Sequence, residues 1–151
     1  MTTTNTSISI TVNYVQIYCE RIFDLLSPST NSSDLSIRQE EEKGVYIAGV
    51  CNVPVKTVAD CLKCMQSGNE NRAVAATSMN AHSSRSHAIF TIHVERRDTE
   101  KEGQGDITFS TLSLVDLAGS ERVAKSHVRG TRFNELKSIN LSLSGNVQKF
   151  V

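Results

Sequence analysis

The sequence contains no long hydrophobic run, and this absence excludes one class of protein. No apolar stretch approaches the roughly 18 residues that a membrane-spanning helix needs. The opening residues, MTTTNTSISI, are polar and do not have the basic-then-apolar order of a secretory leader. Apolar residues make up 38% and charged residues 21% of the 151 residues, which indicates a folded globular chain rather than a disordered one. These observations predict a cytosolic protein that is long enough for one domain with a modest core.

Cysteine is scarce, and its spacing matches neither a disulfide framework nor a zinc site. The four cysteines, Cys19, Cys51, Cys61 and Cys64, lack the pattern of a small secreted domain and are expected to be reduced thiols. Cys61 and Cys64 form a C-x-x-C pair, but no second pair of ligands follows at zinc spacing. Because both also fall within a helical pattern, we interpret them as half-buried helix positions rather than as a metal or redox site.

The whole chain has no net charge, because 16 basic residues balance 16 acidic ones, but the balance is uneven along the sequence. From Gly119 to the C-terminus there are six basic residues and two acidic ones, so this segment carries +4 and the remainder −4. A basic C-terminal segment can face an acidic partner surface, but on charge alone we favour a solvated helix face.

The hydrophobic patterning predicts strands that alternate with helices, without internal repeats. Alternating β-branched and aromatic residues predict strands at residues 9–18, 35–39, 44–50, 52–55, 87–96 and 107–119. Apolar residues at helical spacing predict a short helical turn at residues 19–27 and a helix from Phe133. Residues 1–9 are expected to form a poorly ordered tail, ahead of a single domain at residues 10–151.

A longer helix is expected to begin at Thr57. Thr57 and Asp60 form a variant of the capping box, and Val58, Leu62 and later apolar residues keep one face of the helix apolar. Ser67-Gly68 is expected to interrupt this helix, which can then resume toward the next motif.

An acidic residue stands where an apolar strand ends, in the segment Val115-Asp116-Leu117-Ala118-Gly119. Many α/β enzymes that bind nucleotides hold magnesium with such an Asp, directly or through water. Gly119 allows a backbone N–H to approach a terminal phosphate, because no Cβ stands in the way. Since D-x-x-G is also a common turn, this segment alone is a weak signal.

A second group of polar side chains precedes a strand, in NAHSSRSHAIF. The hydroxyls of Ser83, Ser84 and Ser86 suit phosphate oxygens and metal-bound water, and Arg85 can pair with a carboxylate such as Glu121. The alternative is a polar loop with local capping bonds. We favour a phosphate site because the two motifs occur on successive strands, and we expect Arg85 and Glu121 to lie within about 4 Å of each other.

A serine-hydrolase interpretation of Ser83 with His82 or His87 is not supported by the sequence. The chain has no G-x-S-x-G elbow and no placed acidic partner. His87 opens a strand and is expected to be packed or paired structurally.

Both motifs resemble the switch motifs of the kinesin motor domain. N-x-x-S-S-R-S-H (Asn80–His87) is similar to switch I, and D-L-A-G-S-E (Asp116–Glu121) is similar to switch II. The flanking segments VNYVQIY, GVYIAGV, GNENRAVAAT and SLVDLAGSERVAK resemble the same family, so the similarity covers about residues 10–147. The resemblance implies an α/β fold, namely part of the three-layer, P-loop NTPase-like motor fold with a mixed central sheet and flanking helices.

The resemblance also implies roles for individual residues in binding ATP and Mg2+. Asn80, Ser84 and Gly119 would contact the nucleotide, and Ser84 and Asp116 would lie at the metal. The catalytic residues would be Ser83, Arg85 and Glu121, the last two forming a salt bridge that closes the site.

By the same resemblance, the basic C-terminal segment would face the acidic surface of tubulin. The expected microtubule contacts are Lys125, Arg129, Arg132 and Lys137. The implied protein is an ATP-driven microtubule motor of the cytoplasm and cytoskeleton, and neither nucleic acid nor membrane is expected as a partner.

The sequence departs from the family pattern in one element above all. No G-x-x-x-x-G-K-[ST] phosphate loop occurs in these 151 residues. The chain is therefore expected to be the middle of a motor domain with little ATPase activity of its own, and the alternative is a nucleotide-free module that binds microtubules or another partner. The strand at residues 107–115 would then lack a neighbour and expose an apolar edge. The family also has an Ala-Leu-like pair after Ser144 that this chain lacks.

Overall fold

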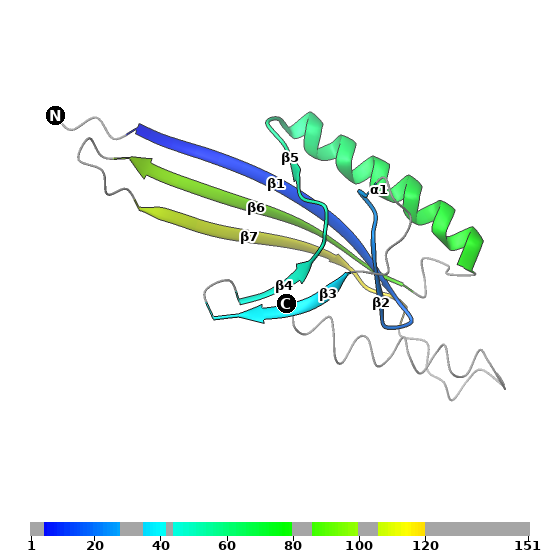
Figure 1. Cartoon of the computed structure of the whole chain (residues 1–151). Helices are drawn as coiled ribbons and strands as arrows, with labels where there is room; N and C mark the ends of the chain where they lie inside the picture. The colour runs from blue at the N-terminus through cyan, green and yellow to red at the C-terminus, as the bar shows by residue number, and fades with distance from the viewer. Residues whose placement is uncertain (1–4, 28–34, 42–43, 80–85, 100–105, 120–151) are drawn as a thin grey trace.

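The structure, a computed structural model, describes residues 5–27, 35–41, 44–79, 86–99 and 106–119 (Figure 1). Within them lie the strands β1 (Asn5–Tyr18), β2 (Arg21–Asp24), β3 (Ser36–Glu40), β4 (Gly44–Ala48), β5 (Val53–Pro54), β6 (His87–Thr99) and β7 (Ile107–Asp116), and the helix α1 (Val58–Met79). These strands and the long helix confirm the α/β class expected from the sequence.

Three long antiparallel strands, in the order β1, β6, β7, form the centre of the structure. Both β2 and β5 pair with β1, also antiparallel. The β6–β7 ladder runs from the Arg97–Ile107 pair to the Ala88–Asp116 pair, so the start of β6 and the end of β7 lie together. Among the described strands, β7 has a neighbour on one edge only.

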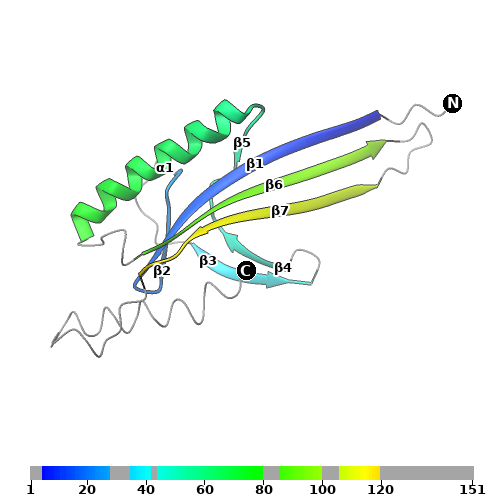
Figure 2. The same cartoon turned by 180° about the vertical axis from the view of Figure 1, so that it is seen from behind.

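The sheet carries a layer on each face: α1 on one side and the β3–β4 hairpin on the other (Figures 1 and 2). Because side chains alternate along a strand, Val12 and Tyr14 of β1 pack on the α1 side, whereas Val15 and Ile17 pack on the hairpin side. Phe90 of β6 joins the first cluster, with its ring edge-on to Tyr14 at a centroid distance of 5.4 Å. The core therefore lies where β1 and β6 pass between the two layers.

The capping box at the start of α1 is confirmed. The Asp60 N–H donates to Oγ1 of Thr57 at 3.1 Å, and the Thr57 N–H donates to Oδ2 of Asp60 at 3.0 Å. Hydrogen bonds to the Asp60 carboxylate, from the Thr57 side chain first and then from the backbone N–H groups of Lys56 and Thr57, hold the pKa of Asp60 below its ordinary value. The reciprocal pair satisfies backbone donors that the first helical turn cannot satisfy itself.

The expected interruption at Ser67-Gly68 is wrong, because α1 runs through both residues without a break. Gly68 is buried against the ring of Tyr14, and a Cβ at this position would lie 2.2 Å from Cδ1 of that ring. The glycine lets the helix approach the sheet closely rather than ending the helix.

The expected helical turn at residues 19–27 is also wrong. Tyr18 and Arg21 pair across a two-residue turn, and Arg21–Asp24 form β2. Cys19 and Glu20 both have positive φ, 48° and 62°, which is the geometry of the tight turns that join antiparallel strands. Ile22 and Leu25 are buried against the sheet, so the short apolar run that suggested a helix belongs to a hairpin.

β1 begins at Asn5, earlier than expected, so residues 5–9 belong to a strand rather than to a poorly ordered tail. The strands expected from the sequence elsewhere in the described ranges are confirmed, with ends shifted by a few residues. The helix expected from Phe133 lies outside the described residues. No helix within the described ranges is long and apolar enough to cross a membrane.

Candidate functional site

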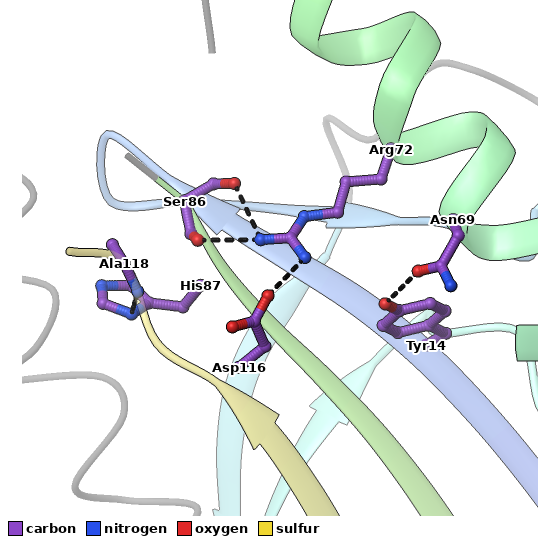
Figure 3. Close-up of polar contacts among 7 residues, drawn as sticks. All are labelled: Tyr14, Asn69, Arg72, Ser86, His87, Asp116 and Ala118. Atoms are coloured by element: carbon purple, nitrogen blue, oxygen red, sulfur yellow. Dashed lines mark hydrogen bonds and ion pairs between the residues drawn. The ribbon is translucent and has the colours of Figure 1, made fainter. Parts of the chain in front are cut away.

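The described ends of the two polar motifs lie close together where β6 begins and β7 ends (Figure 3). Asp116 is the last residue of β7, and its partner in the ladder is Ala88, the second residue of β6. Because the strands are antiparallel, Ser86 and His87 lie beside Asp116 and the residues that follow it. This junction is the candidate site.

Arg72 of α1 reaches across to both strand ends. Its Nη1 lies 2.7 Å from Oδ2 of Asp116, and its Nη2 donates to the carbonyl oxygen of Ser86 at 3.1 Å. The Arg72 side chain is 12% exposed and the Asp116 side chain 67% exposed, so the guanidinium is largely buried while the carboxylate still faces solvent. A planar group with several donors in a fixed fork can hold two acceptors at once, and here it ties α1 to both strands.

Two polar residues at the start of β6 are completely buried. Ser86 and His87 are each 0% exposed, and the hydroxyl of Ser86 lies 3.4 Å from Nη2 of Arg72. The backbone N–H of Ala118 donates to Nδ1 of His87 at 3.0 Å. His87 is therefore paired structurally, as the sequence predicted.

Tyr14 supports the junction from the β1 side. Its hydroxyl donates to Oδ1 of Asn69 on α1 at 2.7 Å. Burial raises the pKa of Tyr14 above its ordinary value, although the nearby Arg72 guanidinium lowers it. The Tyr14 hydroxyl is therefore a neutral donor that fixes the helix on the sheet.

Sequence reasoning did not assign a role to Arg72. A signal for it was present, because Gly68 and Arg72 are four residues apart and so share one face of α1. The close approach at Gly68 identifies this face as the one against the sheet. An arginine on a buried face requires an acidic or carbonyl partner, and Asp116 and Ser86 supply both.

Of the three hydroxyls that the sequence assigned to a phosphate site, that of Ser86 is described, and it is buried beside Arg72 rather than open to a phosphate. The structure also describes two further predicted site residues, Asp116 and Gly119. Both are exposed, and Gly119 directly follows the residue that bonds to His87. The other predicted residues lie outside the described ranges: Asn80, Ser83, Ser84, Arg85, Glu121, Lys125, Arg129, Arg132 and Lys137. The expected pairing of Arg85 with Glu121 therefore stays a prediction.

The described residues could contribute one carboxylate to a bound metal ion. In the described ranges, no three His, Cys, Asp or Glu side chains lie close enough together to hold a metal. Magnesium at nucleotide sites usually keeps several waters and takes other ligands from phosphate, so a single carboxylate is a sufficient contribution from one strand end. Asp116 fits this role, since its side chain is exposed and its Oδ2 binds Arg72.

The C-x-x-C pair occupies ordinary helix positions. Cys61 and Cys64 are half-buried thiols on α1 that pack against the cluster around Val12. Burial, with further contributions from Cys61 and Asp60, raises the pKa of the Cys64 thiol. A raised pKa reduces the thiolate fraction, which is the reactive form.

Comparisons with known proteins agree on one family. The family model described as the kinesin motor domain matches residues 1–147. The chain is 47% identical over 137 residues to the chromosome-associated kinesin KIF4 of Xenopus laevis, covering 89% of this chain and 11% of that protein. It is 46% identical over 147 residues to the kinesin-like protein Klp68D of Drosophila melanogaster, covering 96% of this chain and 18% of that protein.

Solved structures give the same answer. A structure described as that of a fast kinesin matches with a TM-score of 0.76 and 40% identity, covering 90% of this chain and 37% of that one. The motor and motor homology domain of Kar3Vik1 matches with a TM-score of 0.73 and 36% identity, covering 92% of this chain and 34% of that one.

The fold thus matches that of solved motor domains. The chain belongs to the kinesin motor domain family. It spans between about a tenth and a fifth of the length of these two curated relatives, and about a third of the solved chains.

Proposed function

We propose that the chain carries the nucleotide-sensing part of an ATP-hydrolysing microtubule motor. The proposal depends on the junction of the two strand ends. There, the exposed Asp116 and Gly119 lie beside Ser86 and His87, the last residues of the motif Asn80–His87. Membership of the kinesin family supports it, and the solved fast kinesin is described in terms of its ATPase mechanism and its interactions with microtubules.

Little covalent chemistry is required of the protein in phosphoryl transfer to water. The protein orients a water molecule and stabilises the negative charge that spreads over the terminal phosphate. In the proposed site, the backbone N–H of Gly119 would donate to an oxygen of that phosphate, and Asp116 would accept a hydrogen bond from a water of the metal shell. Mg2+, when bound with ATP, would neutralise charge on the phosphates.

The remaining parts of the site are proposed for residues of the two motifs. Asn80 and Ser84 would contact the nucleotide, and Ser84 would also contact the metal. Ser83 would contact the attacking water, and the ion pair between Arg85 and Glu121 would close the site around it. The terminal phosphate would thereby order both motifs, and its release would relax them.

Nucleotide state would be passed on to a microtubule. The proposed contacts are the basic residues Lys125, Arg129, Arg132 and Lys137. Their positive charge complements an acidic track surface and would make binding weaker at high salt. The protein would accordingly act in the cytoplasm, on the microtubule cytoskeleton.

The direct test is ATP hydrolysis by the native protein at its natural length, with and without microtubules. We expect hydrolysis that microtubules stimulate, and a loss of about 100-fold in kcat for Asp116→Asn, because the site would lose its only charged contact to the metal shell among the described residues. Asp106→Asn is the matched control, since Asp106 is an exposed Asp that directly precedes the other end of β7. Equal activity of the two variants would exclude Asp116 from the site.

A motor of this class also needs a phosphate loop with its lysine, which the 151 residues do not contain. Sequencing the native transcript beyond Met1 and Val151 determines whether such a loop is joined to this sequence. If ATP does not change the amount of protein that sediments with microtubules, the result would contradict a motor function. It would instead support a nucleotide-free binding module.

A further inference from the structure

One buried backbone donor, the N–H of Ala118, lies beyond the end of the β6–β7 ladder. The final pair is Ala88 with Asp116, and beyond it the side chain of Leu117 is 51% exposed. The next residue, Ala118, is again buried, with 5% of its surface exposed. Its backbone N–H has left the ladder but has little access to water, so it needs an acceptor from a side chain.

His87 provides that acceptor. The Ala118 N–H lies 3.0 Å from Nδ1 of His87, whose side chain is 0% exposed at the start of β6. A backbone amide can only donate, so Nδ1 must carry the lone pair and the neutral ring must carry its proton on Nε2. This bond joins residues 31 positions apart in the sequence, at the point where both chain segments leave the sheet.

The bond completes a closed circuit of contacts around the junction (Figure 3). Arg72 binds Asp116 and Ser86, and Ser86 is joined through the chain to His87. His87 binds Ala118, which the chain joins back to Asp116. Within this circuit Arg72 fixes the last residue of β7, but the backbone that follows is held by His87.

We propose that His87 is a positioning residue that aims the backbone N–H of Gly119. Gly119 follows Ala118 directly and has no side chain to restrict its own orientation, so the Ala118 bond is the nearest fixed point for this amide. The inference rests on the proposed function, in which the Gly119 N–H donates to the terminal phosphate. It adds a residue to the site that acts through hydrogen bonding and not through contact with the nucleotide.

A pair of substitutions separates hydrogen bonding from packing. Asn and Leu have nearly the same shape, so His87→Asn and His87→Leu leave similar space at the buried site. The Oδ1 atom of Asn stands the same number of bonds from the backbone as Nδ1 of His, and it can accept the Ala118 N–H. Leu cannot accept any hydrogen bond.

The first measurement is hydrogen exchange at the Ala118 amide of the 151-residue chain, relative to the Ile89 and Leu114 amides of the neighbouring strands. We expect exchange at Ala118 to become at least about tenfold faster in His87→Leu and to stay near the wild-type rate in His87→Asn. The ratio to the strand amides corrects for any change in global stability. Equal exchange at Ala118 in the two variants would overturn the proposal, because His87 would then act by packing alone.

The second measurement is microtubule-stimulated ATP hydrolysis by the native protein carrying each variant. His87→Leu should lower kcat by about tenfold or more with little change in the microtubule concentration that gives half-maximal rate, and His87→Asn should restore most of kcat. If Ala118 exchange separates the variants but kcat does not, His87 does not position the reacting centre. If the wild-type protein has no ATPase activity, the proposed function fails, while the exchange measurement still decides whether the bond fixes Ala118.

Discussion

β1 and β7 flank the same strand, β6, but they lie in opposite environments. Residues 12–17 of β1 are all buried, because α1 covers one face and the β3–β4 hairpin covers the other. In β7 nearly every residue from Ile107 to Asp116 is exposed. Both strands have the alternating, β-branched pattern that predicts a strand, so that pattern identifies a strand without showing what covers it.

The contrast is sharpest among large apolar side chains. Ile17 of β1 is 0% exposed, whereas Phe109 of β7 is 71% exposed and Leu112 57% exposed. The segment Ile107–Val115 contains no Lys, Arg or Pro, the residues that commonly protect a sheet edge from further pairing. β7 therefore has the composition of an interior strand and, within the described part of the chain, the position of an edge strand.

The largest expected effect comes from shortening one side chain on each strand. Ile17→Ala should lower the free energy of unfolding by about 2–5 kcal/mol, because it leaves a cavity between β1 and the hairpin. Phe109→Ala should change it by less than about 0.5 kcal/mol, because the ring is already in water. Denaturant unfolding of the 151-residue chain measures both. A comparable loss in Phe109→Ala would show that β7 is covered in solution.

A smaller loss is expected where α1 meets β1. Gly68→Ala adds a Cβ that would lie 2.2 Å from Cδ1 of Tyr14, so the helix or the ring must move. We expect a loss of about 1–3 kcal/mol, despite the higher helix propensity of Ala. Ser67→Ala, at the neighbouring exposed position of the same helix, is the control and should be neutral or slightly stabilising. A neutral Gly68→Ala would mean that α1 packs less closely on the sheet.

The sequence allowed the strands and the cap of α1 to be predicted because these features are local. Period-two alternation and the Thr57–Asp60 pair depend on residues close together in the chain. The errors came from long-range packing. Gly68 was interpreted as a helix breaker because Tyr14, which explains it, is far away in the sequence. The run after Cys19 was interpreted as helical because a short apolar segment fits either structure.

The candidate site was predictable in part for the same reason. Asp116 and Gly119 stand out because a charged residue and a glycine follow an apolar strand. Arg72 and His87 act through partners that the fold supplies, Asp116 for the first and the Ala118 N–H for the second. No local pattern indicates those partners, so the connections between α1, β6 and β7 appear only in the structure.

Within the described part of the chain, one edge of β7 is unpaired, and this predicts self-association of the 151-residue chain. Unpaired backbone donors and acceptors beside apolar side chains favour pairing with the same edge of a second molecule. Leu112→Lys should reduce association several-fold, since it places a charge at the middle of β7. Ala73→Lys, at an exposed position of α1, adds the same charge away from the edge and should not. Sedimentation velocity over a range of concentrations measures the effect, and a wild-type chain that stays monomeric and melts cooperatively would contradict the prediction.

The smallest expected effect concerns His93, which lies between the two contrasted strands. Its Nε2 is 2.9 Å from Nδ2 of Asn13 on β1, and its Nδ1 is 3.3 Å from Oγ1 of Thr111 on β7. The Asn13 amide nitrogen is a donor, also bonded to Asn52, so Nε2 accepts and a proton there would break the contact. Burial lowers the pKa of His93 below its ordinary value.

The sign of the pH dependence follows from this lowered pKa. Between the folded pKa and the ordinary value of about 6.5, the unfolded chain binds more protons than the folded chain, so the free energy of unfolding falls as pH decreases through this range. The loss should be below about 1 kcal/mol, because the ring is only half-buried and solvent screens its charge. His93→Gln keeps an acceptor and cannot titrate, so subtracting its stability between pH 5 and pH 7.5 isolates His93 from the other histidines. If wild type and His93→Gln lose equal stability on acidification, protonation of the His93 ring has no cost. The ring would then lie in water, and the exposed environment of β7 would extend across β6 to Asn13.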